Sequence, residues 1–135
     1  MMDRIIHGDC CEVLKTLPSG SVDFVLTDPP YFVRYRDRSG RSVQNDGNDD
    51  PRRFFRPAGN RSHPTEKDVR VLKPVIQAFR QPGAVVLDPF SGSGSTSVAA
   101  ALAKRRYIAI ELERQYCQPA EKRLAGVARH TARGP

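Results

Sequence analysis

The stretch that decides the fold is residues 84–111, AVVLDPFSGSGSTSVAAALAKRRYIAIE. It opens with an apolar run, residues 84–87, that has the length and composition of a buried strand. A glycine-rich turn follows, and then an alanine-rich stretch, residues 97–103, that is small enough to pack as a helix close to a sheet. A second apolar run at 107–110 ends in an acid, Glu111. Strands that alternate with helices in this way predict parallel pairing and an α/β fold.

The glycine-rich turn has the features of a cofactor site. Gly92 and Gly94 allow a ligand to approach the backbone and permit positive φ. The helix start behind them offers free N–H groups and the positive end of a dipole, which suit a carboxylate or a phosphate. Glu111 lies about 20 residues further on, where nucleoside-binding folds place an acid on the ribose hydroxyls. The alternative is a plain strand-to-helix turn followed by a surface glutamate.

The turn also lacks features of two common nucleotide sites. It has no third glycine of the dinucleotide fingerprint and no Gly-Lys-Ser/Thr of a P-loop. These differences favour a cofactor that presents a carboxylate rather than a pyrophosphate, namely S-adenosylmethionine.

Upstream, a second apolar run at residues 22–27 leads into Asp28-Pro29-Pro30-Tyr31. Two prolines cannot continue a central strand, because each lacks an N–H donor and has a fixed φ. The chain must therefore leave the sheet at the carboxyl end of this strand, which is where ligands bind in open α/β sheets. The plain alternatives are an Asx turn before proline for Asp28 and a half-buried aromatic ring for Tyr31.

The remaining pattern predicts a strand at 4–8, a helix at 10–17 with Asp9 as its N-cap, and helices at 68–79 and 113–128. Pro74 should kink or shorten the helix at 68–79, and Pro119 should interrupt the helix at 113–128. The tail from residue 129 should fray. Residues 32–62 have neither a helical nor a strand period, so we expect an irregular loop within a single domain that spans residues 1–135.

Composition narrows the classes of protein. A net charge of +7 and a pI near 9.8 are consistent with a nucleic-acid partner, although they do not dictate a fold. No apolar run approaches the length of a membrane span, and the N-terminus has no signal-peptide core, so a cytoplasmic location is expected. The cysteines, Cys10, Cys11 and Cys117, are odd in number and contain no Cys-x-x-Cys pair. We therefore predict buried free thiols rather than disulfides or a zinc site.

Four segments together resemble the signature set of amino-group DNA methyltransferases. They are Asp28-Pro29-Pro30-Tyr31, the HPTEK segment at 63–67, the DPFSGSG segment at 88–94 and the IAIE segment at 108–111. The catalytic motif precedes the cofactor motif, as in the permuted β class of N6-adenine and N4-cytosine enzymes. The opening residues 6–14 also match that family's start, and the resemblance covers residues 3–50 and 61–124. It implies a truncated Rossmann-like methyltransferase fold with about four parallel strands and flanking helices.

The resemblance implies transfer of a methyl group from S-adenosylmethionine to the exocyclic amine of adenine (N6) or cytosine (N4), as in restriction-modification systems. The aspartate at the head of the catalytic motif favours adenine. Asp28 and the carbonyl of Pro29 would accept hydrogen bonds from the target amine. Tyr31, after Pro30, would stack on a base that is flipped out of double-stranded DNA. No nucleophile or metal is needed, because the methyl donor is already activated and the rate comes from in-line positioning.

The resemblance also implies a set of binding residues. Glu111 would bind the ribose, Asp9 would reach the adenine edge, and Lys67 would meet the methionine carboxylate. The rest of the cofactor pocket would be formed by His63, Thr65, Asp88, Phe90, Ser91, Gly92 and Gly94. Phosphate contacts to DNA would come from the arginines that follow the catalytic motif, namely Arg34, Arg36, Arg38 and Arg41. The alternatives are a solvated helix start for 63–67 and a solvated charged loop for the arginines.

One part of the family pattern is missing. In the family, a long segment with further strands and the target-recognition region lies between the catalytic tyrosine and the His-Pro-Thr motif. Only residues 32–62 stand there in this chain, which predicts an internal deletion near residues 51–57. The strand at 22–27 would then be an unpaired edge, so we expect marginal stability and a homodimer or another partner at that edge.

Because of this gap, two other functions stay open beside DNA methylation. The chain could be a non-catalytic remnant that binds S-adenosylmethionine or nucleic acid, or a methyltransferase that acts on RNA or a protein amide. The permuted motif order argues against the second of these.

Overall fold

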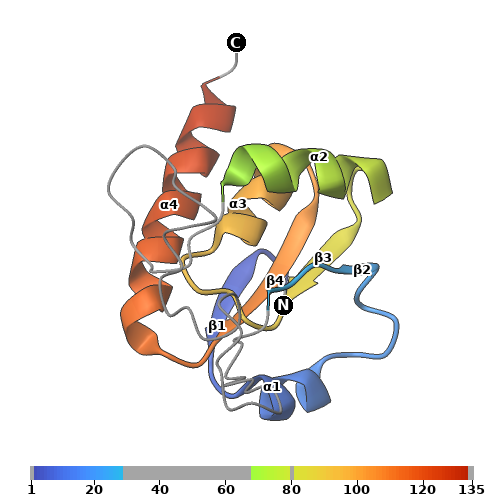
Figure 1. The fold of residues 1–135 in the computed structure, drawn as a ribbon, viewed down its shortest axis with the longest axis vertical. Coiled ribbons are helices and arrows are strands. Elements are labelled where there is room, and N and C mark those ends of the chain that lie inside the picture. The colour runs from blue at the N-terminus through green and yellow to red at the C-terminus, as the bar shows by residue number, and fades with distance from the viewer. Residues whose placement is uncertain (1, 29–67, 80, 134–135) are drawn as a thin grey trace, which may run out of the picture.

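The computed structural model describes residues 2–28, 68–79 and 81–133. Along the chain the elements are β1 (Arg4–His7), α1 (Cys10–Thr16), β2 (Phe24–Val25), α2 (Val69–Phe79), β3 (Val85–Asp88), α3 (Ser95–Leu102), β4 (Arg106–Glu111) and α4 (Arg114–Ala132) (Figure 1). The alternation predicted from residues 84–111 is present as β3, α3 and β4. Residues 32–62 lie outside the described part of the chain, so the expected irregular loop and the single domain remain predictions.

The four strands form one parallel sheet in the order β1-β4-β3-β2. This confirms the α/β class, the parallel pairing and the place of the strand near residue 25 at the end of the sheet. The central strand β3 pairs with β2 on one side and β4 on the other, so that Val86 lies opposite both Phe24 and Tyr107. The glycine-rich turn after β3 therefore emerges between the ends of its two neighbours.

The two faces of the sheet carry separate apolar cores because side chains alternate along each strand. On one face, Val86 packs with residues of α2 and α3, namely Leu72, Ile76, Ala99, Ala100 and Ala103. On the other face, residues of β3 and β4 pack toward β1, α1 and the segment after it, and they are Val85, Leu87, Ile108 and Ile110. In Figure 1, α2, α3 and α4 gather along one side of the sheet and α1 lies on the opposite side.

The strand predicted at residues 22–27 is shorter in the structure. Only Phe24 and Val25 have strand geometry. Backbone contact to β3 continues on both sides, because Asp23 N–H donates to Val85 O at 3.0 Å and Leu26 N–H donates to Leu87 O at 3.0 Å. At its start, however, the Asp23 carboxylate accepts the Val85 N–H at 2.8 Å and takes the place of a backbone partner. Within the described residues, this strand has a neighbour on one side only.

The predicted interruption of the last helix at Pro119 was wrong, and α2 is not shortened at Pro74. α2 continues through Pro74 to Phe79, and α4 continues through Pro119. A proline inside a helix costs about 3 kcal/mol, but each of these prolines is close to residues that anchor the helix by burial. Leu72 and Ile76 do so in α2, and in α4 the buried residues are Cys117, Ala120 and Leu124. Tertiary packing outweighs the local penalty.

The predicted fraying of the tail was also wrong for residues 129–132, because α4 ends only at Ala132. The Thr131 hydroxyl donates to the carbonyls of Val127 and Ala128, each at 3.1 Å, within this last stretch. Among the described helices, none combines the length and apolar character needed to cross a membrane.

Candidate cofactor and catalytic site

The candidate site lies at the carboxyl ends of β3 and β4, around the turn that leads into α3. Gly92 has φ of 54° and Gly94 has φ of 81°, so both adopt the positive φ that glycine permits. Gly94 is the N-cap of α3 in the left-handed conformation, and no side chain caps this helix. A Cβ atom on Gly94 would lie 2.8 Å from the Cβ of Ala120 in α4. The turn is thus pressed against α4 at a point where only glycine fits.

Glu111, at the end of β4, is in direct contact with this turn. Its Oε2 accepts the Gly92 N–H at 2.7 Å, and its Oε1 accepts the Glu113 N–H at 2.8 Å. The side chain is buried, with 9% of the residue exposed. A carboxylate has about four acceptor positions, and these two backbone donors use two of them. Glu111 therefore keeps acceptor capacity for hydroxyl groups of a ligand.

Unused hydrogen-bonding groups gather at the same turn. The Ser91 side chain is buried, and its Oγ has no hydrogen-bond partner among the described residues. The first N–H groups of α3 lack a capping side chain and form the positive end of the helix dipole. Buried polar atoms are rarely left without a partner. A ligand with a carboxylate and hydroxyl groups fits this combination of free donors, a serine hydroxyl and the Glu111 carboxylate.

Asp88 links the turn to the strand that carries the catalytic motif. It is 4% exposed, and its Oδ1 accepts a hydrogen bond from the Thr27 hydroxyl at 2.8 Å and from the Phe90 N–H at 3.0 Å. Asp88 thus faces protein groups on two sides, whereas Phe90 is exposed. The sequence did not identify Thr27 as part of the site. The one feature that could have pointed to it is a hydroxyl at the end of an apolar run.

Asp28 follows Thr27 directly and is half-buried, so the first residue of the predicted catalytic motif lies next to the hydrogen bond from Thr27 to Asp88. The other predicted catalytic residues, Pro29, Pro30 and Tyr31, lie outside the described part of the chain. So do the predicted cofactor residues His63, Thr65 and Lys67 and the predicted DNA contacts Arg34, Arg36, Arg38 and Arg41. The roles assigned to all of these residues remain predictions.

Asp9 lies just beyond the carboxyl end of β1, and β1 pairs with β4 so that His7 lies opposite Glu111. The His7 ring nitrogen Nε2 donates to Leu112 O at 3.0 Å, which joins the ends of the two strands. Asp9 Oδ1 accepts the Cys11 N–H at 2.8 Å, which confirms the predicted N-cap of α1. Asp9 therefore follows β1, and Glu111 ends the adjacent strand β4, so both lie at the carboxyl ends of neighbouring strands, as a shared nucleoside site requires.

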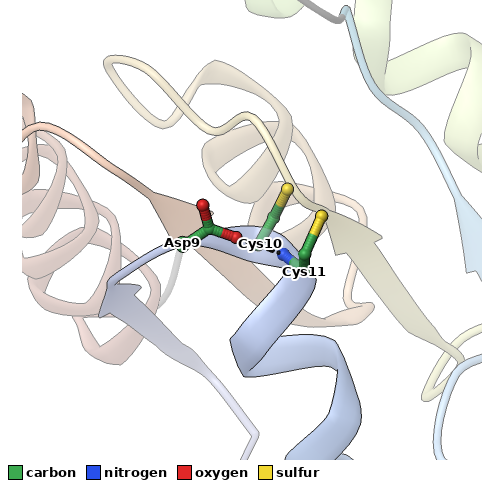
Figure 2. A group of neighbouring side chains, drawn as sticks. All are labelled: Asp9, Cys10 and Cys11. Carbon is green, nitrogen blue, oxygen red and sulfur yellow. Dashed lines mark hydrogen bonds between the residues drawn. The ribbon is translucent and has the colours of Figure 1, made fainter.

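The prediction of buried thiols was correct for Cys117 only. Cys117 is buried, Cys10 is half-buried and Cys11 is exposed at the start of α1, a helix without a fully buried residue. Figure 2 shows the two adjacent thiols side by side, next to Asp9, and their potential ligand atoms lie within 4.8 Å of one another. The pKa of the Cys11 thiol is raised, first by Cys10 and then by Asp9, since a thiolate there would meet other negative groups. This favours the protonated thiol, which is a poor metal ligand.

Comparison with known proteins agrees with this geometry. Residues 34–122 match the family described as DNA methylase, the N6/N4 methyltransferases. YubD of Escherichia coli (strain K12), whose name marks it as an unproven methylase, is 34% identical over an alignment of 215 positions that covers 98% of this chain and 95% of YubD. The type II methyltransferase M.HinfI of Haemophilus influenzae is 46% identical over 66 residues, which are 49% of this chain and 18% of M.HinfI.

Among solved structures, TTHA0409 of Thermus thermophilus, complexed with S-adenosyl-L-methionine, superposes with a TM-score of 0.68. It is 21% identical, and the match covers 92% of this chain and 95% of that chain. At this identity the likeness concerns the fold alone.

The alignment with YubD also bears on the length of the chain. It has 215 positions, whereas this chain has 135 residues, so at least 80 positions of YubD have no counterpart here. Because the alignment covers nearly all of both proteins, this difference is internal. By the match over residues 34–122 and the extended similarity to YubD, the chain belongs to the N6/N4 DNA methylase family.

Proposed function

We propose that the chain is an S-adenosylmethionine-dependent DNA methyltransferase that acts on the exocyclic amine of a base, with adenine N6 favoured over cytosine N4. The observation that carries the proposal is the hydrogen bond from the Gly92 N–H to Glu111. It holds the carboxylate that would bind the ribose of a nucleoside against the glycine-rich turn. Asp28 follows β2, the strand on the other side of that turn. Membership of a DNA methylase family supports DNA as the substrate.

The residues around the turn fit the proposed cofactor. Glu111 would accept hydrogen bonds from the two ribose hydroxyls with its remaining acceptor positions. The Ser91 hydroxyl and the first N–H groups of α3 would bind the methionine carboxylate. Asp9 would accept from the adenine amine at the end of β1. When bound, the cofactor supplies a methyl group on a positively charged sulfur, and this group needs no further activation.

The catalytic half of the proposal rests on Asp28. Its carboxylate would accept a hydrogen bond from the target amine and orient the nitrogen lone pair toward the methyl group. The hydrogen bond from Thr27 to Asp88 supports this role, because it fixes the residue before Asp28 to the cofactor turn. Holding two reactants in line lowers the barrier by removing the entropic cost of their encounter. Pro29, Pro30 and Tyr31 would complete the base-binding loop around a flipped base.

A second candidate is a non-catalytic remnant that binds the cofactor without transferring its methyl group. The observation that favours it is the internal difference of at least 80 positions relative to YubD. If those positions carry the strands and the recognition region expected after the catalytic motif, the cofactor half would remain without the DNA-reading half. Cofactor binding alone does not separate the two candidates.

Methyl transfer separates them. The chain is incubated with methyl-labelled S-adenosylmethionine and unmethylated genomic DNA, and cofactor binding is measured in parallel by calorimetry. Asp28→Asn removes the catalytic carboxylate, and Asp68→Asn is the matched control, because Asp68 is a carboxylate that pairs with Arg70 outside the site. Asp3→Asn is a second control, because Asp3 pairs with Arg106 at the start of β4, the opposite end of the strand from Glu111. Label in DNA with the wild type and with Asp3→Asn, but not with Asp28→Asn, is the expected result. Undiminished label with Asp28→Asn contradicts the role of Asp28, and binding without label supports the remnant.

A further inference from the structure

We propose that Arg123 of α4 is a positioning residue that holds residues 91–95 of the turn in the shape that accepts the cofactor. The inference rests on the proposed function in one respect, namely that the ligand of this turn is S-adenosylmethionine. No sequence motif points to Arg123, which lies 30 residues beyond Ser93, one of the two serines that it contacts.

Arg123 donates hydrogen bonds to this turn. Its Nη1 donates to the Ser93 carbonyl oxygen at 2.9 Å, and the hydroxyls of Ser93 and Ser95 each lie 3.1 Å away. Both serines are buried, with 3% and 6% of their surface exposed. Hydrogen bonds from a charged donor to buried acceptors are stronger than those between neutral groups. Arg123 therefore fixes the second half of the turn to α4.

α4 contacts the turn at a second point on the same helix face. Ala120 lies three residues before Arg123, so both side chains point to one side of α4. A Cβ atom on Gly94 would lie 2.8 Å from the Ala120 Cβ, which shows how closely the backbone of the turn approaches the helix there. Ala120 thus limits the position of Gly94 by contact, and Arg123 limits the residues on both sides of it by hydrogen bonds.

The turn needs such outside support because its own sequence provides little. Gly92 and Gly94 both have positive φ, and glycine loses more conformational freedom on ordering than any other residue. No side chain caps the helix that follows. Glu111 of β4 holds the first half through the Gly92 N–H. The turn is therefore held from two sides, by an acid of β4 and a base of α4.

The expected effect follows from populations. A ligand that binds only one shape of the turn has an apparent Kd that rises in inverse proportion to the fraction of molecules in that shape. If the turn without Arg123 has the binding shape about one tenth of the time, Kd rises about tenfold. The guanidinium charge beside the start of α3 also adds to the dipole that would attract the cofactor carboxylate.

The test compares the full-length wild type with Arg123→Gln, Arg123→Lys and the control Lys122→Gln. Lys122 is the exposed neighbour of Arg123, so its substitution removes the same charge from the same helix. Calorimetry measures the Kd for S-adenosylmethionine and S-adenosylhomocysteine, and hydrogen exchange measures the protection of the amides at 92–95. We expect Arg123→Gln to raise Kd about tenfold or more and to speed exchange at 92–95. Arg123→Lys should lie between it and the wild type, and Lys122→Gln should match the wild type.

A further variant keeps the test valid if Arg123→Gln does not fold. Ser95→Ala removes one acceptor and leaves Arg123 in place, so it should raise Kd in the same direction by a smaller factor. Where Arg123→Gln does fold, and if both substitutions act through one contact, the double variant should cost less than the sum of the two single effects. Fully additive effects would show that the contact is not responsible.

The other outcomes distinguish this inference from the proposed function. Equal Kd values for the wild type and Arg123→Gln overturn the positioning role and leave the proposed function standing. A uniform rise in exchange across the sheet, without a local effect at 92–95, shows a general structural role and also overturns it. A wild type that binds neither cofactor form refutes the proposed function, and the inference about its cofactor falls with it.

Discussion

Replacing Gly94 by alanine is expected to lower the free energy of unfolding by about 2–5 kcal/mol. Gly94 has φ of 81°, and an L-residue with a side chain pays about 1–2 kcal/mol for this left-handed conformation. In addition, the new Cβ would lie 2.8 Å from the Cβ and 3.4 Å from the Cα of Ala120, so a helix backbone is in the way. Overpacking of this kind costs about 1–3 kcal/mol.

A matched variant separates the two contributions. Gly83 has φ of 86°, and a Cβ there would meet nothing within 4 Å. Gly83→Ala should therefore show the conformational cost alone, about 1–2 kcal/mol. Urea unfolding followed by circular dichroism measures both variants, and an unchanged m-value shows that the difference in midpoint reflects stability. The excess loss in Gly94→Ala is the cost of the contact with α4.

A second substitution checks the mechanism. Ala120→Gly removes the atom that the new Cβ would meet, and by itself it should cost about 1 kcal/mol or more, because glycine is a poor helix former. Combined with Gly94→Ala, it should recover part of the loss, so the double variant is more stable than the sum predicts. If Gly94→Ala proves no more costly than Gly83→Ala, the close approach of the turn to α4 is refuted.

Three further predictions follow from other contacts. Thr27→Val removes the hydrogen bond to Asp88, so we expect a loss of about 1 kcal/mol in the free energy of unfolding. We also expect slower methyl transfer with an unchanged Kd for the cofactor. A higher Kd with a normal rate of transfer would contradict the proposal that this hydrogen bond positions Asp28. Burial raises the pKa of the Cys117 thiol above its ordinary 9.0 in the folded protein. The neutral thiol therefore stabilises the fold fully below pH 9, and this stabilisation is lost as the pH rises through the pKa of the folded state. Above pH 9, the urea midpoint should thus fall less steeply with pH in Cys117→Ala than in the wild type. Equal slopes in the two proteins would refute this. If β2 associates through its edge, light scattering should show oligomers that Val25→Lys dissociates, because an edge lysine disfavours strand pairing; a dilute monomer before substitution would exclude this partner site.

The sequence was most informative where the local pattern and the tertiary environment agree. β3, α3 and β4 were predicted within a few residues, because a buried parallel strand is apolar throughout and the alanines of α3 must lie close to the sheet. Gly92 and Gly94 were identified as residues that permit positive φ, and both adopt it in the structure. The place of residues 22–27 at the end of the sheet came from the family resemblance and not from local pattern.

The misses share a different cause. Pro119 was predicted to interrupt its helix and Pro74 to kink or shorten its own, but both helices continue through these prolines, beside residues that are buried. The hydrogen bonds from Thr27 to Asp88 and from Arg123 to Ser93 join residues 61 and 30 positions apart. No periodicity or turn chemistry connects such pairs, so only the folded chain reveals them.

The short β2 strand gives the two halves of the site different mechanical properties. The cofactor turn is attached to the two central strands and to α4, whereas Asp28 follows a strand of two residues that pairs with β3 alone within the described part of the chain. Segments with few such anchors open locally at a small cost in free energy. We therefore expect the proposed cofactor turn to be the more rigid part of the site and the segment around Asp28 to adjust when a base arrives. Such a division favours an ordered reaction in which the methyl donor binds before the DNA.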